Sequence, residues 1–257
     1  MTEQKYAVAS RRSGIFYGVG VGPGDPDLLT IKAFNLIKTA PVVSYLVSKS
    51  HGSQAKTIAR LALAERQGYF AAIPEHRQDD IAIDILMAKD RTMANTAYQR
   101  AADRIKNVLN SGQDVVFLCE GDPLFFGSFG YLLELIQDEY PCQVIPGISS
   151  VNAAASVVLQ PLVMLKESCV VVSGQHQDQQ IEQALRQHDS VVIMKAGQAR
   201  PRILKLLEIT GRSADATYLE YIGRDNQNVV TDVTQLASEP GPYFSLFVVL
   251  PVEARNQ

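Results

Sequence analysis

The sequence predicts two α/β domains, the first with a mainly parallel sheet and the second with a mixed sheet. Short apolar runs alternate with segments of helical period along most of the 257 residues, a pattern typical of strands joined by crossover helices. Near the C-terminus, two strand-like runs are separated only by a turn at 239–242, which favours antiparallel strands in the second sheet. The length is also that of two domains, at roughly 100–200 residues each.

The first domain is expected over residues 14–163, after a flexible tail at 1–13. Its opening strand breaks into a glycine-rich turn. There Asp25 is expected to cap a helix that starts at Pro26, because proline lacks the amide that would be unpaired at that position. The segment 54–109 is rich in alanine and charge and is expected to be mostly helical. Further strands are expected at 42–46, 114–119 and 142–145, and further helices at 129–137 and 151–158.

The second domain is expected over residues 166–257, after the helix-breaking run Gln160-Pro161-Leu162. A kink within one domain is the alternative interpretation of that run. Strands are expected at 169–173, 191–195, 216–221, 229–236 and 243–252, and helices at 178–187 and 200–210.

The composition is that of a soluble globular protein, with 46% hydrophobic and 20% charged residues. Its 24 basic and 27 acidic residues give a net charge of −3, so no overall positive field attracts nucleic acid. No apolar run reaches the length of about 18 residues that a membrane span needs. Residues 1–13 lack the apolar core of a secretory signal, and the three widely spaced cysteines suit neither disulfides nor zinc. A cytoplasmic location is therefore expected.

Glycine and proline gather in three loops of the first half, each after an expected strand. Ligands of open α/β sheets bind at the carboxyl ends of the strands, so these loops form the expected binding site. Two of them share the triplet Gly-Asp-Pro, at 24–26 and 121–123, which is either a local turn-and-cap device or part of a ligand site. An aspartate at a helix start repels a pyrophosphate, which favours a neutral or cationic ligand.

The sequence lacks the motifs of several common chemistries. The glycines at 18 and 20 lack the third small residue of the dinucleotide-binding pattern, because Pro23 or Asp25 stands where it is needed. No P-loop and no Gly-x-Ser-x-Gly elbow occurs, and the four histidines are isolated. Neither a metal site nor a covalent nucleophile is indicated. The loops instead offer backbone groups and hydroxyls that can hold and orient a cofactor.

Three segments together resemble the tetrapyrrole (corrin and porphyrin) methyltransferase family in their order and approximate spacing. They are Gly18-Val-Gly-Val-Gly-Pro-Gly-Asp-Pro-Asp-Leu-Leu-Thr30, Gly121-Asp-Pro-Leu-Phe-Phe-Gly127 and Pro146-Gly-Ile-Ser-Ser-Val-Asn-Ala-Ala-Ala155. The string at 120–132 is most similar to the precorrin-2 C20-methyltransferase branch of that family. The run Tyr243-Phe-Ser-Leu-Phe-Val-Val249 is similar to the closing strand of the same branch.

The resemblance implies a homodimer whose chains bind S-adenosyl-L-methionine in a cleft between two α/β domains. It also implies methylation of C20 of precorrin-2 or cobalt-factor II in cobalamin biosynthesis. Where relatives often carry a tyrosine, this chain has Phe126, which offers no hydroxyl contact. Carried over onto this sequence, the implied cofactor-binding residues are Val21, Pro23, Gly121, Asp122, Phe125, Ser149, Ser150, Met194, Ile222 and Ser245.

The tetrapyrrole implied by the family is fringed with carboxylates, so a local cationic rim is expected although the chain is acidic overall. Ordinary solvated surface charge is the alternative for each candidate. The proton that leaves C20 has Asp122, Glu120 and solvent as candidate acceptors. The cysteines Cys119, Cys142 and Cys169 are expected to be small buried residues rather than cobalt ligands. The candidates for the rim are Lys49, His51, Lys195, Arg200, Arg202 and Arg224.

Two other functions remain compatible with the sequence. A methyltransferase of the same family could act on another ring carbon, such as C1 and C7 of uroporphyrinogen III, although the run at 125–131 favours the C20 branch. A non-catalytic tetrapyrrole carrier is the alternative outside enzymes. The presence of all three loops disfavours it.

Overall fold

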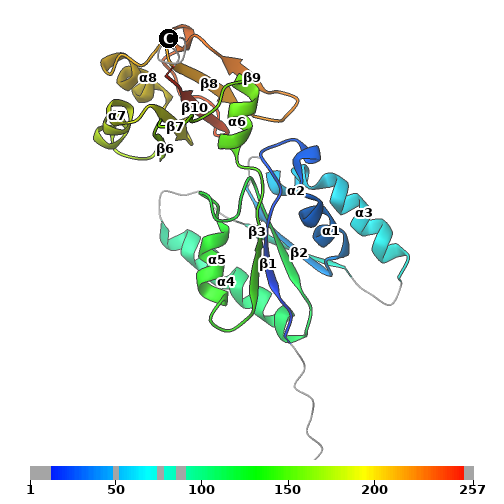
Figure 1. Ribbon diagram of the computed structural model, residues 1–257. Helices are drawn as coiled ribbons and strands as arrows, with labels where there is room; N and C mark the ends of the chain where they lie inside the picture. Colours follow the sequence, from blue (N-terminus) through cyan, green and yellow to red (C-terminus); the bar gives the residue numbers. More distant parts are fainter. Residues whose placement is uncertain (1–12, 49–51, 74–77, 85–90, 252–257) are drawn as a thin grey trace, which may run out of the picture. The chain divides into compact units, whose positions relative to one another are not determined.

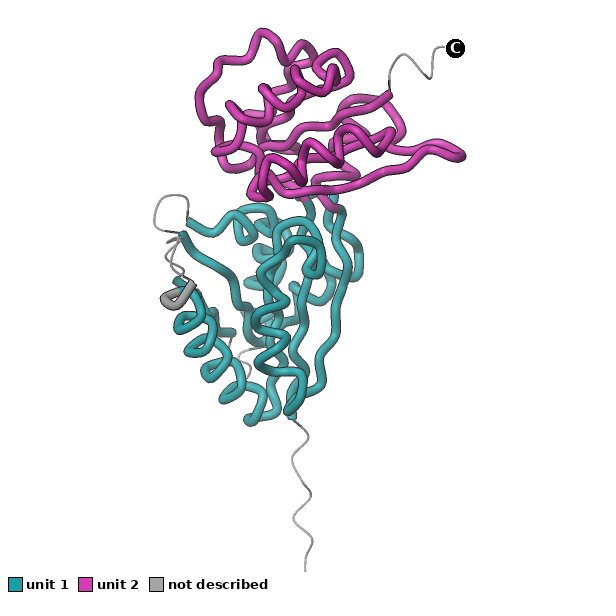
Figure 2. The backbone as a smooth tube through the Cα atoms, turned by 90° about the vertical axis from the view of Figure 1, so that its left-hand side faces the viewer, with its two compact units in different colours: residues 1–22, 26–148 teal, residues 23–25, 149–257 magenta. Residues whose placement is uncertain are grey.

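The computed structural model describes residues 13–48, 52–73, 78–84 and 91–251. The chain divides into two compact units, coloured separately in Figure 2: residues up to 22 with 26–148, and residues 23–25 with 149–257. Each unit contains one five-stranded sheet, parallel in the first unit and mixed in the second, which confirms the predicted fold class. Within the described ranges, no helix is long and apolar enough to cross a membrane.

The first sheet has the strand order β3-β2-β4-β1-β5, and every neighbouring pair is parallel. In β4, Phe117 faces one hydrophobic core and Leu118 faces the other. A strand that is buried on both faces is apolar throughout, which is why the sequence predicts this one clearly. The strands are β1 (Phe16–Gly20), β2 (Val42–Val47), β3 (Asp79–Asp84), β4 (Val115–Cys119) and β5 (Cys142–Ile145).

Helices cover both faces of the first sheet (Figure 1). Side chains of α4 and α5 share one core with Phe16 and Phe117. Side chains of α1, α2 and α3 share the other core with Val43 and Tyr45 of β2. The helices are α1 (Ile31–Thr39), α2 (Gln54–Ile58), α3 (Arg60–Ala71), α4 (Arg91–Asn110) and α5 (Phe129–Ile136), with a short 3₁₀ helix η1 (Pro26–Leu28) before α1.

The first α-helix begins later than predicted. Pro26 starts the 3₁₀ turn η1, and α1 begins only at Ile31. Its N-cap is Thr30, whose hydroxyl oxygen accepts a hydrogen bond from the Ala33 amide at 3.1 Å. The prediction that Asp25 caps this helix is therefore wrong, because Thr30 supplies the acceptor one turn further on.

Strand β3 lies inside the segment that the sequence predicts to be mostly helical. It is an edge strand that pairs with β2 in parallel. Only Ile81 and Ile83 are buried in it, and they alternate with more exposed residues. Two buried side chains are too weak a period-2 signal to stand out beside long helical stretches.

The second sheet has the order β6-β7-β10-β8-β9, in which β10 is antiparallel to both of its neighbours. A core that includes Ile181, Ile203 and Phe247 lies between this sheet and helices α7 and α8. The strands are β6 (Cys169–Ser173), β7 (Ser190–Met194), β8 (Ala216–Glu220), β9 (Asn228–Val230) and β10 (Ser245–Val249). The helices are α6 (Ser150–Val158), α7 (Asp178–Gln187), α8 (Arg200–Ile209) and the 3₁₀ turn η2 (Val233–Gln235).

The antiparallel arrangement differs in detail from the prediction. The strand expected at 229–236 is only three residues long, and η2 follows it. This strand pairs with β8, whereas β10 lies between β7 and β8. The turn at 239–242 therefore does not join two paired neighbours.

Helix α6 belongs to the second unit, whereas the sequence predicts it within the first domain, residues 14–163. Its buried residues are the small side chains Val151, Ala153 and Ala154. Small side chains at helical spacing indicate that a helix packs closely against a neighbour. They do not indicate which sheet that neighbour belongs to. The short segment 23–25 likewise belongs to the second unit, although the residues on either side of it belong to the first.

Candidate functional site

Two loops at the carboxyl ends of adjacent strands are joined in the first unit. Residues 21 and 22 follow β1, and Gly121 lies just after β4, its parallel neighbour. The Gly121 amide donates to the Gly22 carbonyl oxygen at 2.8 Å, and the Gly22 amide donates back at 3.3 Å. This small antiparallel bridge fixes the two loops relative to each other at the edge of the sheet where parallel α/β folds bind ligands.

The loop after β5 is held against the same bridge by direct contact between backbones. A Cβ atom placed on Gly147 would lie 2.1 Å from the Gly121 carbonyl oxygen. One placed on Gly20 would lie 2.5 Å from the Gly147 amide nitrogen. Backbone atoms at such distances leave no volume for a side chain, so glycine is required at these positions.

Asp122 connects two of these loops through its carboxylate. Oδ1 accepts a hydrogen bond from the Leu124 amide at 2.9 Å, and Oδ2 accepts one from the Gly147 amide at 3.1 Å. Helix α5 begins only at Phe129, so Asp122 does not cap it. The carboxylate of the second Gly-Asp-Pro triplet therefore links the loop after β4 to the loop after β5, and its part in a ligand site stays a prediction.

The same loop exposes an aromatic pair next to Asp122. Phe125 and Phe126 are 36% and 40% exposed, and their ring centroids lie 5.2 Å apart in an edge-to-face arrangement. Phe126 has a φ of +54°, a left-handed conformation that is rare for a bulky residue. Strained residues of this kind cluster at ligand sites. By contrast, Val21 is fully buried, so its side chain packs in the core.

The two predicted serines mark the start of α6 in the second unit. Ser149 is the N-cap residue, and its hydroxyl oxygen accepts from the Asn152 amide at 3.3 Å. The same hydroxyl donates to the Asn152 side-chain oxygen at 2.7 Å. Ser150 is the first helical residue. Capping of α6 therefore accounts for the contacts of the Ser149 hydroxyl.

Several other predicted residues meet at one edge of the second sheet. Met194 ends β7 and pairs with Leu246, while Ser245 begins the antiparallel β10 between β7 and β8. The Ala196 amide donates to the Ser245 carbonyl oxygen at 3.2 Å. Lys195 and Tyr221, which directly follow β7 and β8, both have left-handed φ angles, of +54° and +52°. Two strained residues at one edge make it the candidate ligand edge of this unit.

The segment 23–25 lies beside the same edge. A Cβ atom on Gly24 would lie 2.3 Å from the Ile222 carbonyl oxygen, and one on Gly223 would lie 2.8 Å from the Asp25 amide nitrogen. Gly24, the residue after the predicted Pro23, is therefore a neighbour of Ile222, which is predicted from the second half of the chain. Residues far apart in sequence are thus brought together at this edge.

Comparison with known proteins identifies the family. The family described as Tetrapyrrole (Corrin/Porphyrin) Methylases matches residues 16–237. The chain belongs to the tetrapyrrole methylase family. The predicted resemblance is confirmed.

Among its relatives, this tetrapyrrole methylase is 31% identical to a precorrin-2 C(20)-methyltransferase from Sinorhizobium sp over 92% of this chain and 95% of the relative. It is 26% identical to a cobalt-precorrin-2 C(20)-methyltransferase from Salmonella typhimurium over 92% and 96% of the two chains. A uroporphyrin-III C-methyl transferase from Thermus thermophilus, solved with S-adenosylhomocysteine, has a TM-score of 0.65 at 22% identity. That alignment covers 93% of each chain and supports the fold.

The basic residues predicted as a substrate rim differ in their surroundings. Arg200 is largely buried, 3.6 Å from a Glu220 carboxylate oxygen, and donates to the Glu239 carbonyl oxygen at 2.7 Å. Arg202 pairs with Asp178 and donates to the carbonyl oxygens of residues 174 and 176. These two arginines hold loops of the second unit together.

Two of the other rim candidates lie within the described residues. The Arg224 guanidinium stacks 4.0 Å from the centroid of the Phe244 ring. Lys195 is partly buried, and this burial lowers the pKa of its ammonium group. Lys49 and His51 lie outside the described residues. The rim at these positions stays a prediction.

The cysteines do not form a metal site in the described part of the chain. Burial raises the pKa of the Cys119 thiol well above its ordinary value, so this thiol is neutral and packs in the core. Cys142 is half-buried, but Cys169 is exposed, so the expectation of burial is wrong for Cys169. It starts β6, an edge strand, where a side chain is covered less well. No cluster of three or more histidine, cysteine or acidic side chains occurs among the described residues.

Proposed function

We propose that this tetrapyrrole methylase transfers a methyl group from S-adenosyl-L-methionine to C20 of precorrin-2 or of its cobalt-containing form, in cobalamin biosynthesis. The names of two relatives that align over more than nine-tenths of this chain support the reaction. The structural observation that carries it is the loop Gly121–Phe126, fixed by the Gly22 bridge and by the Asp122 carboxylate. A cytoplasmic homodimer is the proposed form of the protein.

The residues at the two sheet edges fit a neutral or cationic cofactor. In the first unit, Gly121, Asp122 and Phe125 combine fixed backbone, a carboxylate and exposed apolar surface. In the second unit, the proposed contacts are Pro23, Ser149, Ser150, Met194, Ile222 and Ser245. S-adenosylmethionine supplies a methyl group that is already activated on a sulfonium centre.

The chemistry requires positioning more than acid or base catalysis. An activated methyl group needs no enzyme nucleophile, which agrees with the absence of nucleophile motifs from the sequence. Holding two reactants in an attack geometry contributes about 7–11 kcal/mol to lowering a barrier. The closely packed glycine backbones at 20, 121 and 147 give loops that are rigid enough for this role.

Two alternatives remain for the reaction. Methylation of C1 and C7 of uroporphyrinogen III is the nearest, since structurally similar proteins include a uroporphyrin-III C-methyl transferase. The sequence relatives that align over more than nine-tenths of the chain favour C20 instead. A non-catalytic tetrapyrrole carrier is the second alternative.

Incubation with S-adenosylmethionine that carries a ¹³C-labelled methyl group tests the proposal. The protein is incubated separately with precorrin-2, cobalt-factor II and uroporphyrinogen III, and the labelled carbon is located by NMR. We expect label at C20 of precorrin-2 or cobalt-factor II. Label at another ring carbon, or on none of the three, would contradict the proposal. Failure to bind S-adenosylhomocysteine in calorimetry would support the carrier.

A further inference from the structure

A groove in the first unit is lined by cationic and hydroxyl-bearing residues that are not among the predicted site residues. It has a volume of about 480 Å³ and lies between β2 and helices α2 and α3. Two of its nine lining residues, Lys56 and Arg60, are cationic, and none is acidic. The hydroxyl groups of Tyr45 and Thr57 and the apolar side chains of Val47 and Leu63 complete most of the lining.

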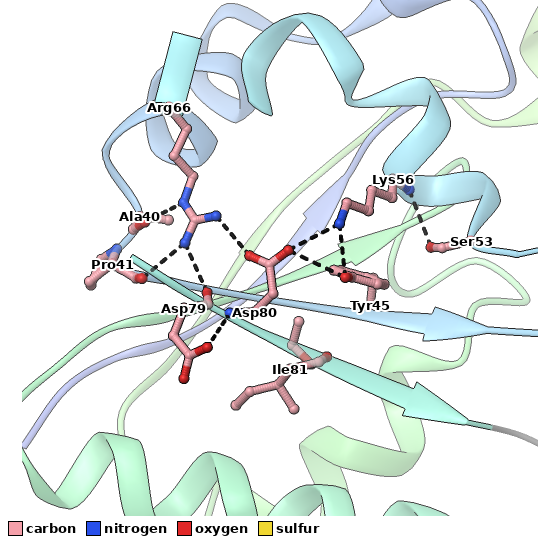
Figure 3. Close-up of polar contacts among 10 residues, drawn as sticks. Ala40, Pro41, Tyr45, Ser53, Lys56, Arg66, Asp79, Asp80 and Ile81 are labelled. Atoms are coloured by element: carbon pink, nitrogen blue, oxygen red, sulfur yellow. Dashed lines mark hydrogen bonds and ion pairs between the residues drawn. The ribbon is translucent and has the colours of Figure 1, made fainter. Parts of the chain in front are cut away.

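Lys56 is paired with a neighbouring aspartate, which it shares with a second cation. Its ammonium group donates to Asp80 at 3.1 Å and to the Tyr45 hydroxyl at 3.0 Å (Figure 3). Asp80 also accepts from the buried Arg66 guanidinium at 2.8 Å. One carboxylate therefore serves two cations, and no negative charge is left over for a third.

Arg60 is the remaining cation of the groove. It is exposed at the first position of α3, and it makes no ion pair or hydrogen bond with a residue in the described ranges. A guanidinium in a groove that also presents apolar side chains is suited to a carboxylate carried on an aliphatic arm, because it binds carboxylates with two parallel hydrogen bonds. The aliphatic part of the arm would contact Val47 and Leu63.

The groove is close to the binding loop of the same unit. Strands β2 and β4 are parallel neighbours in which Ser44 pairs with Phe117. Because the two strands run in the same direction, the carboxyl end of β2, where Val47 lies, is at the same edge of the sheet as the carboxyl end of β4, which Gly121 follows. The groove thus reaches the edge of the sheet at which the loop 121–127 begins.

We propose that this groove receives one carboxylate arm of the tetrapyrrole substrate, with Arg60 as the ionic contact. The inference rests on the proposed function, which supplies a substrate fringed with carboxylates. It gives the acidic substrate a cationic contact in the first unit, in addition to the predicted rim. Arg60 binds substrate in this proposal and takes no part in the bond-making step.

Substitution of Arg60 by alanine and by lysine tests the proposal. For Arg60→Ala we expect the KM for precorrin-2 to rise about three- to tenfold, with kcat unchanged, because one exposed or half-buried charged contact is lost. The dependence of KM on salt should become weaker than in the parent protein. Arg60→Lys keeps the positive charge but not the pair of parallel donors. Its KM should therefore lie between that of the parent protein and that of Arg60→Ala.

Lys38→Ala is the matched control. Lys38 is also a cation beside α3, where it pairs with Glu65 at 3.0 Å, and it lines no part of the groove. The net charge changes equally, but the KM should stay at the parent value. Equal KM values and salt dependences for Arg60→Ala and Lys38→Ala would overturn the proposal. The proposed function would still stand if both variants methylate C20.

Binding measurements separate the substrate from the cofactor, which also carries a carboxylate. The Kd of S-adenosylhomocysteine, measured by calorimetry, should be the same for Arg60→Ala and the parent protein. A raised Kd for S-adenosylhomocysteine together with an unchanged KM for precorrin-2 would assign the groove to the cofactor and overturn the proposal. If the parent protein fails to methylate any of the three tetrapyrroles, the proposed function fails first.

Discussion

The contact between Gly147 and Gly121 is the tightest constraint on the proposed cofactor loops. A side chain at position 147 would meet the Gly121 carbonyl oxygen, a backbone atom that cannot turn away as a flexible side chain can. We expect Gly147→Ala to lower the free energy of unfolding by about 1–3 kcal/mol, as overpacking does. It should also raise the Kd of S-adenosylhomocysteine at least about tenfold, a loss of 1.4 kcal/mol.

Chemical denaturation and calorimetry measure these two effects, and Gly130→Ala is the control. A Cβ atom on Gly130 would meet nothing within 4 Å, and the residue lies in helix α5. Alanine there should leave the cofactor Kd unchanged and the stability equal or up to about 1 kcal/mol higher. Parent-like cofactor binding by Gly147→Ala would show that the three loops do not position the cofactor.

At the scale of elements, one buried arginine links the edge strand β3 to its neighbour β2. The Arg66 side chain from α3 donates to the carbonyl oxygens of residues 40, 41 and 79, and it pairs with Asp80. It thereby ties the start of β3 to the start of β2. The edge strand β3, which has few buried side chains of its own, is held partly by this polar network.

The network makes the stability of the first unit depend on pH. Burial raises the pKa of Asp80, but the hydrogen bonds from Arg66 and Lys56 outweigh burial and hold it below the ordinary value of 3.8. A lowered pKa means that the folded state favours the charged form. The contribution is therefore complete above about pH 4, where unfolded aspartate is ionised, and is lost as the pH falls through the folded-state pKa.

We expect Asp80→Asn to be less stable than the parent protein by about 1–3 kcal/mol at pH 7, because Arg66 loses its charged partner. This difference should narrow as the pH falls below about 4. Urea denaturation at several pH values measures it. Asp84→Asn, at the exposed end of the same strand, should stay within about 0.5 kcal/mol of the parent throughout. A constant difference for Asp80→Asn between pH 7 and pH 3 would contradict the argument.

The elements that the sequence predicts well are those with strong local signals. Strand β4 is apolar throughout, and α7 has one clear apolar face, so both were predictable. Strand β3 is not predictable in this way, because it is held in part by the contact between Arg66 and Asp80. These two residues are 14 positions apart and lie on different elements, α3 and β3. The predicted start of α1 is wrong because Asp25 and Thr30 are both residue types that cap helices well. The residue types alone do not show which of the two is the N-cap.

At the scale of the whole molecule, the sequence located the glycine-rich loops but not what surrounds the charged residues. The loops were found because glycine and proline mark backbone positions directly. Whether an arginine is free to bind a ligand depends on neighbours distant in sequence. Arg200, a predicted rim residue, is instead engaged by residues 220 and 239. Arg60, which the sequence does not predict as a rim residue, lines the groove and has no ion-pair partner within the described ranges.

The proposed cofactor contacts, which lie in both units, lead to a prediction for hydrogen exchange. A ligand at 100 times its Kd stabilises the bound state by about 2.7 kcal/mol and suppresses the local openings that expose its contacts. With S-adenosylhomocysteine, we expect slower amide exchange in the first unit at 120–128 and in the second unit at 149–152, 194–196, 222–224 and 243–246. Helix α7, which carries none of the proposed contacts, is the internal control and should exchange at an unchanged rate.

Protection confined to the first unit would contradict the assignment of Met194, Ile222 and Ser245. Protection in both units that disappears in Gly147→Ala would show that binding by the second unit requires the rigid loops of the first.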